Sequence, residues 1–186
     1  MQSLLNRATE DAAAILPAIA RLGPELERLG QMMMECWSHK GKLLVCGNGG
    51  SACDAMLLSE ELVARFEKKR RGLASIALCD PSVITCAGND FGYETVFSRQ
   101  VEALGNQGDL LIVLTTSGNS SNILRAIEQA KRQQMRTAAF LGKDGGKAKG
   151  QCDVELVVPA QTSHRIQEGH QILYHTLCEW IDQRVD

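Results

Sequence analysis

The stretch that decides how this sequence folds is Gly47-Asn48-Gly49-Gly50-Ser51. It follows an apolar run at 42–46 and precedes a helical pattern at 54–66. A strand, a glycine-rich turn and a helix start leave unpaired backbone N–H groups where an anion can bind, and glycines allow close approach of the backbone. Ser51 can cap the helix or donate to a phosphate. The stretch is therefore either a plain strand-to-helix turn or one wall of a phosphate site.

A second loop of the same kind spans Thr115-Thr116-Ser117-Gly118-Asn119-Ser120 and follows an apolar run at 109–114. Its four hydroxyls, with backbone N–H groups, can hold a phosphate dianion without Lys or Arg. Turn and cap chemistry alone needs fewer hydroxyls. Two such loops favour phosphate binding over plain turns. A nucleoside triphosphate is not predicted, because the chain has no P-loop lysine after the glycines and its spacing fails the dinucleotide fingerprint.

Length and composition restrict the class of protein. The 186 residues suit one domain with a sizeable core, and the net charge of −2 argues against a nucleic-acid partner. We interpret the basic run at 68–71 as a solvated loop. No apolar stretch is long enough to span a membrane, and the N-terminus lacks a signal-peptide pattern. The seven cysteines include no Cys-x-x-Cys pair, which favours reduced core residues and a cytoplasmic location.

The order of apolar segments predicts an α/β fold. Strands are expected at 42–47, 73–79, 109–115, 136–141 and 153–158. Helices are expected at 52–66, at about 81–104 in two pieces, at 119–133, and from about Ser163 to Arg184. Near-continuous apolar strands separated by helices predict a parallel sheet with helices on both faces. Ligands bind beyond the carboxyl ends of such strands, where both glycine-rich loops fall.

Residues 1–39 precede the alternating pattern and read as two helices, divided at Gly23-Pro24. They cannot belong to the alternating unit, so we expect them to cover the sheet or to pack on another subunit. With no internal repeat or linker, the chain is predicted to be one domain, 1–186, in which 1–39 is an N-terminal helical extension.

Two predicted helices carry candidate catalytic groups. Glu60 and Glu61 point about 100° apart, so one should face inward. Glu61 can form a surface salt bridge with Arg65 one turn later, or it can aim at the ligand site, and composition does not decide between these. On the last helix, His175 has both a structural and a catalytic interpretation.

The motifs together resemble those of the sugar isomerase (SIS) domain family. They are Gly47-Asn-Gly-Gly-Ser51, Asp54-Ala55, Glu60-Glu61-Leu62, Arg65-Phe66, Gly88-Asn89-Asp90, Thr116-Ser-Gly-Asn-Ser120, Gly142-Lys-Asp-Gly-Gly146, and Arg165-Ile-Gln-Glu168 with His175. The resemblance covers nearly the whole chain and is strongest to members that isomerise sedoheptulose 7-phosphate.

The resemblance implies a flavodoxin-like five-stranded sheet, a homotetramer, and conversion of sedoheptulose 7-phosphate to glycero-manno-heptose 7-phosphate, towards the heptose of bacterial lipopolysaccharide or glycoproteins. It implies that the phosphate is held by Ser51, Thr115, Ser117 and Ser120. Residues implied to contact the sugar are Asn48, Gly49, Gly50, Arg65, Asn89, Asp90, Thr116 and Gln167. Glu61 and His175 match the catalytic acid/base pair, as an enediol reaction requires one group for the carbon-bound proton and another for the oxygens.

Many members of this family hold zinc between these groups, where zinc can polarise the carbonyl. A family ligand, a His one turn before the catalytic Glu, is Leu57 here. Glu61, Gln167 and His175 remain as three implied ligands, so we expect zinc to be weakly bound or absent. His164 stands where some members carry Asp, and it could replace a ligand only if the helix start bends inward.

Three functions stay open at this stage. The first is an active isomerase, favoured by the presence of Glu61 and His175. The second is a non-catalytic SIS protein that binds a phosphosugar or a partner such as a replication initiator, favoured by the loss of the metal-site His. The third is an isomerase of another phosphosugar, because selectivity for chain length depends on pocket shape.

Overall fold

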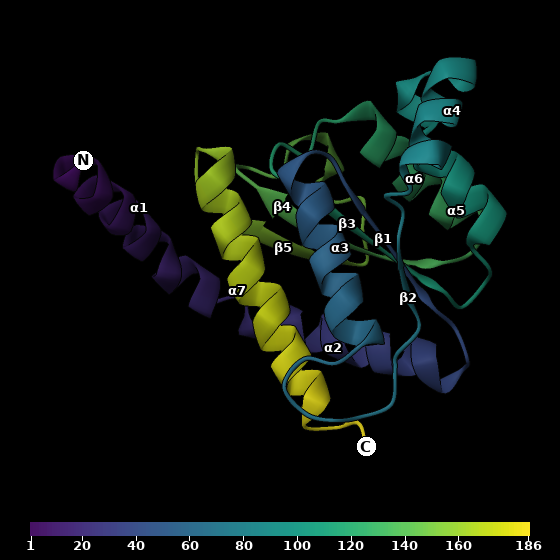
Figure 1. The fold of residues 1–186 in the computed structure, drawn as a ribbon, viewed down its shortest axis with the longest axis horizontal. Helices are drawn as coiled ribbons and strands as arrows, with labels where there is room; N and C mark the ends of the chain where they lie inside the picture. The colour runs from purple at the N-terminus through teal and green to yellow at the C-terminus, as the bar shows by residue number, and fades with distance from the viewer.

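All 186 residues are described by a computed structural model of the chain. Its strands are β1 (Leu43–Gly47), β2 (Ser75–Ala77), β3 (Leu110–Thr115), β4 (Arg136–Gly142) and β5 (Val154–Val158). They form one parallel sheet in the order β2-β1-β3-β4-β5 (Figure 1). This is the flavodoxin-like order. From β1 the chain adds β2 on one side of the sheet and then adds β3, β4 and β5 on the other, so the switch point lies between β1 and β3. The predicted five-stranded parallel sheet is confirmed.

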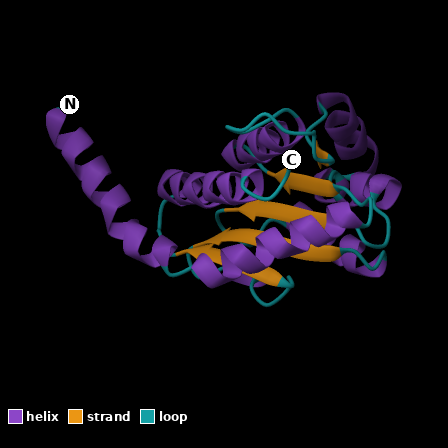
Figure 2. Ribbon diagram, turned by 90° about the horizontal axis from the view of Figure 1, so that it is seen from below, coloured by secondary structure: helices purple, strands orange, loops and turns teal.

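Seven helices surround the sheet. They are α1 (Gln2–Ala20), α2 (Gly23–Ser38), α3 (Gly50–Val63), α4 (Pro81–Phe91), α5 (Ser98–Leu104), α6 (Ser121–Arg132) and α7 (Ser163–Asp182), with short 3₁₀ turns at Tyr93–Thr95 and Gly146–Ala148. Helices α2, α3 and α7 and the end of α1 cover one face, and α4, α5 and α6 cover the other (Figure 2). Each helix is too short or too polar to cross a lipid bilayer.

The central strand β3 shows why both faces are covered. Side chains alternate along a strand, so Leu110, Ile112 and Leu114 enter the core under α3 and α7. Leu111 and Val113 enter the second core, under α5 and α6. All five are fully buried, and each contributes roughly 1.5–3 kcal/mol of hydrophobic stabilisation. Because β3 has apolar side chains on both faces of the sheet, both faces must be covered by helices at this strand.

The two N-terminal helices differ in how they are held. Helix α2 packs closely on α7, since a Cβ on Gly30 would lie 2.9 Å from the Trp180 ring. Helix α1 buries only Ile15 and Ile19, in its last turns. Its first half projects away from the rest of the molecule (Figures 1 and 2). The expectation that these helices cover the sheet is confirmed for α2 and for the end of α1.

Three predicted boundaries are corrected. The strand predicted at 73–79 is only three residues long, because β2 is an edge strand that pairs with β1 alone. The helix predicted at 52–66 begins at Gly50 and ends at Val63, where Ala64 leaves helical geometry with φ −83° and ψ −82°. The last helix ends at Asp182.

The interpretation of the basic run 68–71 as a solvated loop is wrong for one residue. The Arg70 side chain is 0% exposed and forms an ion pair with Asp182. The interpretation of the cysteines as core residues holds for Cys36, Cys46 and Cys178, whereas Cys53 and Cys86 are exposed; all seven are free thiols.

Candidate functional site

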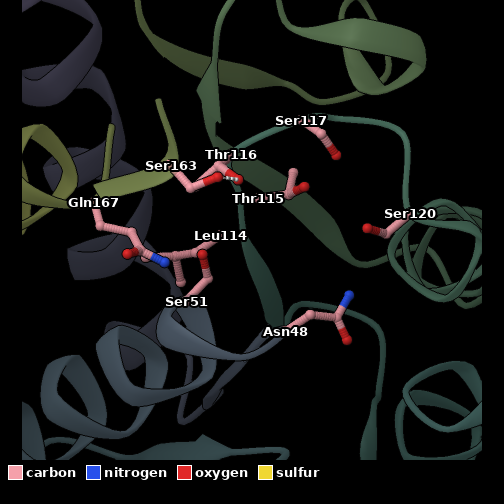
Figure 3. Close-up of a pocket in the computed structure, with 9 residues that line it drawn as sticks. All are labelled: Asn48, Ser51, Leu114, Thr115, Thr116, Ser117, Ser120, Ser163 and Gln167. Atoms are coloured by element: carbon pink, nitrogen blue, oxygen red, sulfur yellow. Dashed lines mark hydrogen bonds between the residues drawn. The ribbon is translucent and has the colours of Figure 1, made fainter. Parts of the chain in front are cut away.

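The two glycine-rich loops meet at one cavity of about 180 Å³. Because β1 and β3 are parallel neighbours, their carboxyl ends lie at the same edge of the sheet, and the loop after each strand borders the same space. The lining residues are Asn48, Ser51, Leu114, Thr115, Thr116, Ser117, Ser120, Ser163 and Gln167. Figure 3 shows their polar side chains arranged around this opening. The structure thus brings together all four residues implied to hold a phosphate.

The hydroxyls in this cavity are available as donors. The backbone N–H of Gly118 donates to Thr115 Oγ1 (3.1 Å), and that of Asn119 donates to Ser117 Oγ (3.2 Å). Each of these hydroxyls therefore accepts a bond within the loop and keeps its own O–H for a ligand. Ser120 is the N-cap of α6 but makes no side-chain cap bond. No charged side chain lines the cavity, so an anion would be held by hydroxyls and by the N-termini of α3 and α6.

The second loop is held in shape by the loop that follows β4. Gly118 has a φ of +63°, and a Cβ there would lie 1.9 Å from the carbonyl oxygen of Gly145. The backbone N–H of Ala148 donates to the Gly118 carbonyl (2.9 Å), and that of Lys147 donates to the Asn119 side chain (3.2 Å). The motif at 142–146 therefore supports the cavity rather than lining it.

Asn48 is fixed by two partners that the sequence did not indicate. Its amide exchanges two hydrogen bonds with the amide of Asn122, at 2.9 and 2.8 Å, and accepts one from the Tyr93 hydroxyl at 3.0 Å. Asn122 is 1% exposed and lies on α6. Asn48 Oδ1 accepts the bonds from Asn122 and Tyr93, and one N–H of the Asn48 amide donates to Asn122. The other N–H of the Asn48 amide is free for a ligand.

Helix α7 supplies the remaining wall. Ser163, at its first position, is 3.2 Å from the Thr116 hydroxyl. The Gln167 amide lies directly over Gly50, where an added Cβ would approach its Nε2 to 2.4 Å. Gln167 is among the residues implied by the family resemblance, whereas the sequence indicates Ser163 only as the start of a helix. Because Thr162 is the N-cap of this helix and hydroxyl residues are common around helix starts, the sequence has no separate signal for Ser163.

Helices α3 and α7 run side by side (Figure 1), and polar groups bridge them. Asp54 is buried, and its Oδ1 accepts bonds from Gln171 (3.2 Å) and from the Tyr174 hydroxyl (3.4 Å). Burial raises the pKa of Asp54, and these two bonds together with nearby His175 offset part of that rise. Its Oδ2 has no protein partner.

Further along this helix pair lie the Glu61 carboxyl, near the end of α3, and the His175 ring, on α7. Burial raises the pKa of the Glu61 carboxyl, the adjacent Glu60 adds to the rise, and His175 opposes it. The His175 ring is stacked on Phe66 at a centroid distance of 5.8 Å and meets the Tyr174 ring edge-on at 4.6 Å. A partly desolvated carboxylate and an imidazole on two helices that pack together are groups suited to proton transfer.

Other residues implied by the resemblance lie outside the cavity lining. Arg65 lies past the end of α3, is exposed, and donates to the Glu67 carbonyl (3.2 Å), so it forms no salt bridge with Glu61. Asn89 and Asp90 are exposed near the end of α4 and bond to each other at 2.7 Å. Gly49 is exposed in the first loop, with a φ of +58°. His164 is exposed and bonds to Thr162 (3.3 Å), so the helix start does not turn it inward.

The residues present do not fit a tightly held zinc ion. No three His, Cys, Asp or Glu side chains are grouped so that they could share a metal ion. Leu57, at the family's His position, is a hydrocarbon side chain packed against the core. Of the three implied ligands, only Glu61 and His175 are common zinc donors, and the third, Gln167, is a weak one.

Comparison with known proteins decides the family. The SIS domain family matches residues 9–142, which is more than half of the chain. The phosphoheptose isomerase 1 of Campylobacter jejuni is 45% identical over 98% of this chain and 99% of its own. The chain belongs to the phosphoheptose isomerases of the SIS domain family. The phosphoheptose isomerase of Vibrio parahaemolyticus is likewise 46% identical, over 100% of this chain and 97% of its own.

Solved phosphoheptose isomerases also share the fold. The enzyme from Francisella tularensis superimposes with a TM-score of 0.94, at 39% identity, over 99% of this chain and 100% of its own. The enzyme from Neisseria gonorrhoeae gives 0.91 at 37% identity, over 98% of both chains. The resemblance that the sequence motifs indicated is confirmed.

Proposed function

We propose that this phosphoheptose isomerase family member converts sedoheptulose 7-phosphate to D-glycero-D-manno-heptose 7-phosphate. The observation that carries the proposal is the hydroxyl-lined cavity at the N-termini of α3 and α6, with Glu61 and His175 further along the α3–α7 pair. The cavity would bind the phosphate group of the sugar, and the Glu61 carboxylate and the His175 imidazole would transfer the protons.

The spacing between these two parts favours a long sugar. Ser51 and Glu61 are ten residues apart on α3, which is about 15 Å along the helix axis. Helical side chains lean towards the N-terminus, so the Glu61 carboxylate reaches back towards the cavity. A seven-carbon chain anchored by its phosphate spans the remaining gap better than a triose or tetrose phosphate does.

The proposed reaction moves one proton between neighbouring carbons. Glu61 removes a proton from C1 while His175 donates one to the oxygen on C2, which gives an enediol. Glu61 then returns its proton to C2, and His175 takes the proton from the C1 hydroxyl as the aldehyde forms. The raised pKa of Glu61, caused by burial, makes its carboxylate a stronger base.

Solvent deuterium tests this reaction class. The protein would be incubated with sedoheptulose 7-phosphate in D₂O, and the sugar followed by proton NMR. We expect the aldose to appear with deuterium at C2, because the proton carried by Glu61 exchanges with solvent in the enediol state. If the sugar binds but no aldose forms, the chain acts as a phosphosugar-binding SIS protein, and Leu57 would be part of the reason.

Replacing Ser117 with Ala should mainly weaken substrate binding. Its hydroxyl would hold the phosphate equally in the ground state and in the transition state, so its loss raises KM about tenfold and changes kcat little. Steady-state kinetics measures both constants. Ser121→Ala is the matched control, because Ser121 is exposed in the first turn of α6 and does not line the cavity. A loss confined to kcat in Ser117→Ala would contradict a phosphate contact.

Zinc is proposed as a weakly held or absent cofactor. Glu61, Gln167 and His175 are the ligands that the family resemblance implies, and Gln167 is the weak donor among them. Leu57→His would supply a further imidazole one turn before Glu61, so we expect this variant to retain more zinc after gel filtration. Elemental analysis of both proteins measures the difference. Equal metal content would show that position 57 does not face the proposed ligands.

We also propose a homotetramer in the cytoplasm. The projecting half of α1 exposes Leu4 and Leu5, each at 54%, which supports self-association through this helix. Seven free thiols support a reducing compartment. Light scattering should give the mass of four chains, and the mass of one chain would contradict the assembly.

A further inference from the structure

The end of α3 and the end of α7 are joined by one buried side chain, Arg70. The chain leaves α3 at Val63 and returns past both helices towards β2. On this return, the Arg70 guanidinium donates to Asp182 Oδ1 (2.6 Å), to the Glu61 carbonyl (2.8 Å) and to the Leu62 carbonyl (2.9 Å). A further bond, to its neighbour's carbonyl at Arg71, measures 3.0 Å.

Asp182 completes this junction from the other side. Its Oδ2 accepts the backbone N–H groups of Glu67 (3.0 Å) and Lys68 (2.8 Å). The side chains of Arg70 and Asp182 are only 0% and 6% exposed. Burial alone would raise the pKa of Asp182, but its bonds to Lys68, Arg70 and Glu67 outweigh burial and hold it below the usual value. The pair is therefore ionised, buried and fully hydrogen-bonded, the condition under which a buried ion pair is rigid.

The junction of Arg70 and Asp182 is connected to both members of the proposed proton-transfer pair, Glu61 and His175. Arg70 bonds to the backbone of Glu61 itself. Asp182 follows His175 by seven residues, which is two turns, so the two side chains project from the same face of α7. We propose that the Arg70–Asp182 pair is a positioning device that sets Glu61 against His175, an inference that rests on the roles assigned to those two residues above.

Arginine suits this role better than lysine. The last carbonyls of a helix have no partner within the helix, and a cation there is also favoured by the helix dipole. The planar guanidinium reaches both carbonyls of α3 and the carboxylate of α7 at once, with fixed angles between its donors. A lysine ammonium would keep the charge opposite Asp182 but could not keep all three contacts.

Arg70→Lys is the variant that tests the proposal. Since an error of about 1 Å in placing a catalytic group can cost 100-fold in rate, we expect kcat to fall about 10- to 100-fold. KM should change less than about threefold, because the phosphate cavity lies at the opposite end of α3. The matched control is Lys42→Met, which breaks the partly buried ion pair with Asp109 (2.5 Å) at the amino end of the sheet. This control should lower the melting temperature and leave kcat unchanged.

Hydrogen–deuterium exchange tests the junction without relying on activity. In Arg70→Lys, the amides of residues 61–73 should exchange faster than in the wild-type protein, while those of 115–120 should not change. Wild-type exchange rates at 61–73 in Arg70→Lys would overturn the proposal, and so would a wild-type kcat in that variant. A loss of kcat in Lys42→Met equal to that in Arg70→Lys would also overturn it. If the wild-type protein shows no isomerisation, the proposed function fails, and the exchange data then decide whether Arg70 orders the two helix ends.

Discussion

Replacing Glu61 with Gln is expected to lower kcat by about 10²- to 10⁴-fold, the range for loss of a general base. The amide has nearly the volume of the carboxylate but cannot take a proton from carbon. Phosphosugar binding should persist, because none of the hydroxyls that line the cavity is changed. Isothermal calorimetry with sedoheptulose 7-phosphate and a coupled assay for the aldose measure the two effects separately.

Glu60→Gln is the matched control for this prediction. Glu60 is adjacent but exposed, and it points about 100° away around the helix. It should keep a kcat close to that of the wild type. Near-normal turnover in Glu61→Gln would exclude Glu61 as the base, and equal losses in the two variants would indicate a general effect of charge.

Gly118→Ala is expected to lower the stability of the protein and to distort its proposed phosphate site. The backbone φ of +63° disfavours alanine by about 1 kcal/mol, and the new Cβ would meet the Gly145 carbonyl oxygen at 1.9 Å. Relieving that overlap should cost about 1–3 kcal/mol more and separate the two loops. Because Thr115 and Ser117 are held by bonds from this loop, KM should rise together with the fall in stability.

Gly108→Ala is the matched control, because it carries the cost of a positive φ without a steric clash of the new Cβ. Gly108 has a φ of +90°, but nothing lies within 4 Å of an added Cβ, and it does not line the cavity. This control should lose about 1 kcal/mol of stability in chemical denaturation and keep the wild-type KM. A Gly118→Ala protein as stable as Gly108→Ala, with unchanged KM, would show that contact with the 142–146 loop does not shape the cavity.

The sequence predicts the sheet and the two loops at its edge because both depend on local patterns. Apolar runs near 42–47 and 109–115 mark two strands, and the carboxyl ends of parallel neighbours must meet. The loops that follow these strands face the same space because β1 and β3 are neighbours in the sheet, which the strand order of the structure shows. The sequence pattern alone places the hydroxyls of the second loop at the carboxyl end of a strand.

Residues missed by the sequence analysis owe their roles to contacts far along the chain. Asn122 pairs with Asn48 across 74 residues, and Arg70 pairs with Asp182 across 112. Nothing within a short window distinguishes Arg70 from the three other basic residues of its run, so composition indicated a solvated loop. Only the packing of α3 against α7 shows which of the four is buried.

Leu57 shows the opposite case, in which the identity of a single residue predicts a property of the site, namely weak or absent zinc binding. Its side chain cannot bind a metal, and the structure packs it against the core instead of gathering other donors nearby. Proton transfer is therefore assigned to Glu61 and His175 themselves, and no step of the proposed reaction passes through zinc.

The measurement that tests this account most directly is isomerisation of sedoheptulose 7-phosphate by the purified protein, first after treatment with a chelator and then with added zinc. The account predicts turnover after chelation and at most a modest increase with zinc. Absence of turnover in both states, while the phosphosugar still binds, would contradict it and would identify the chain as a phosphosugar-binding member of the family that does not catalyse the reaction.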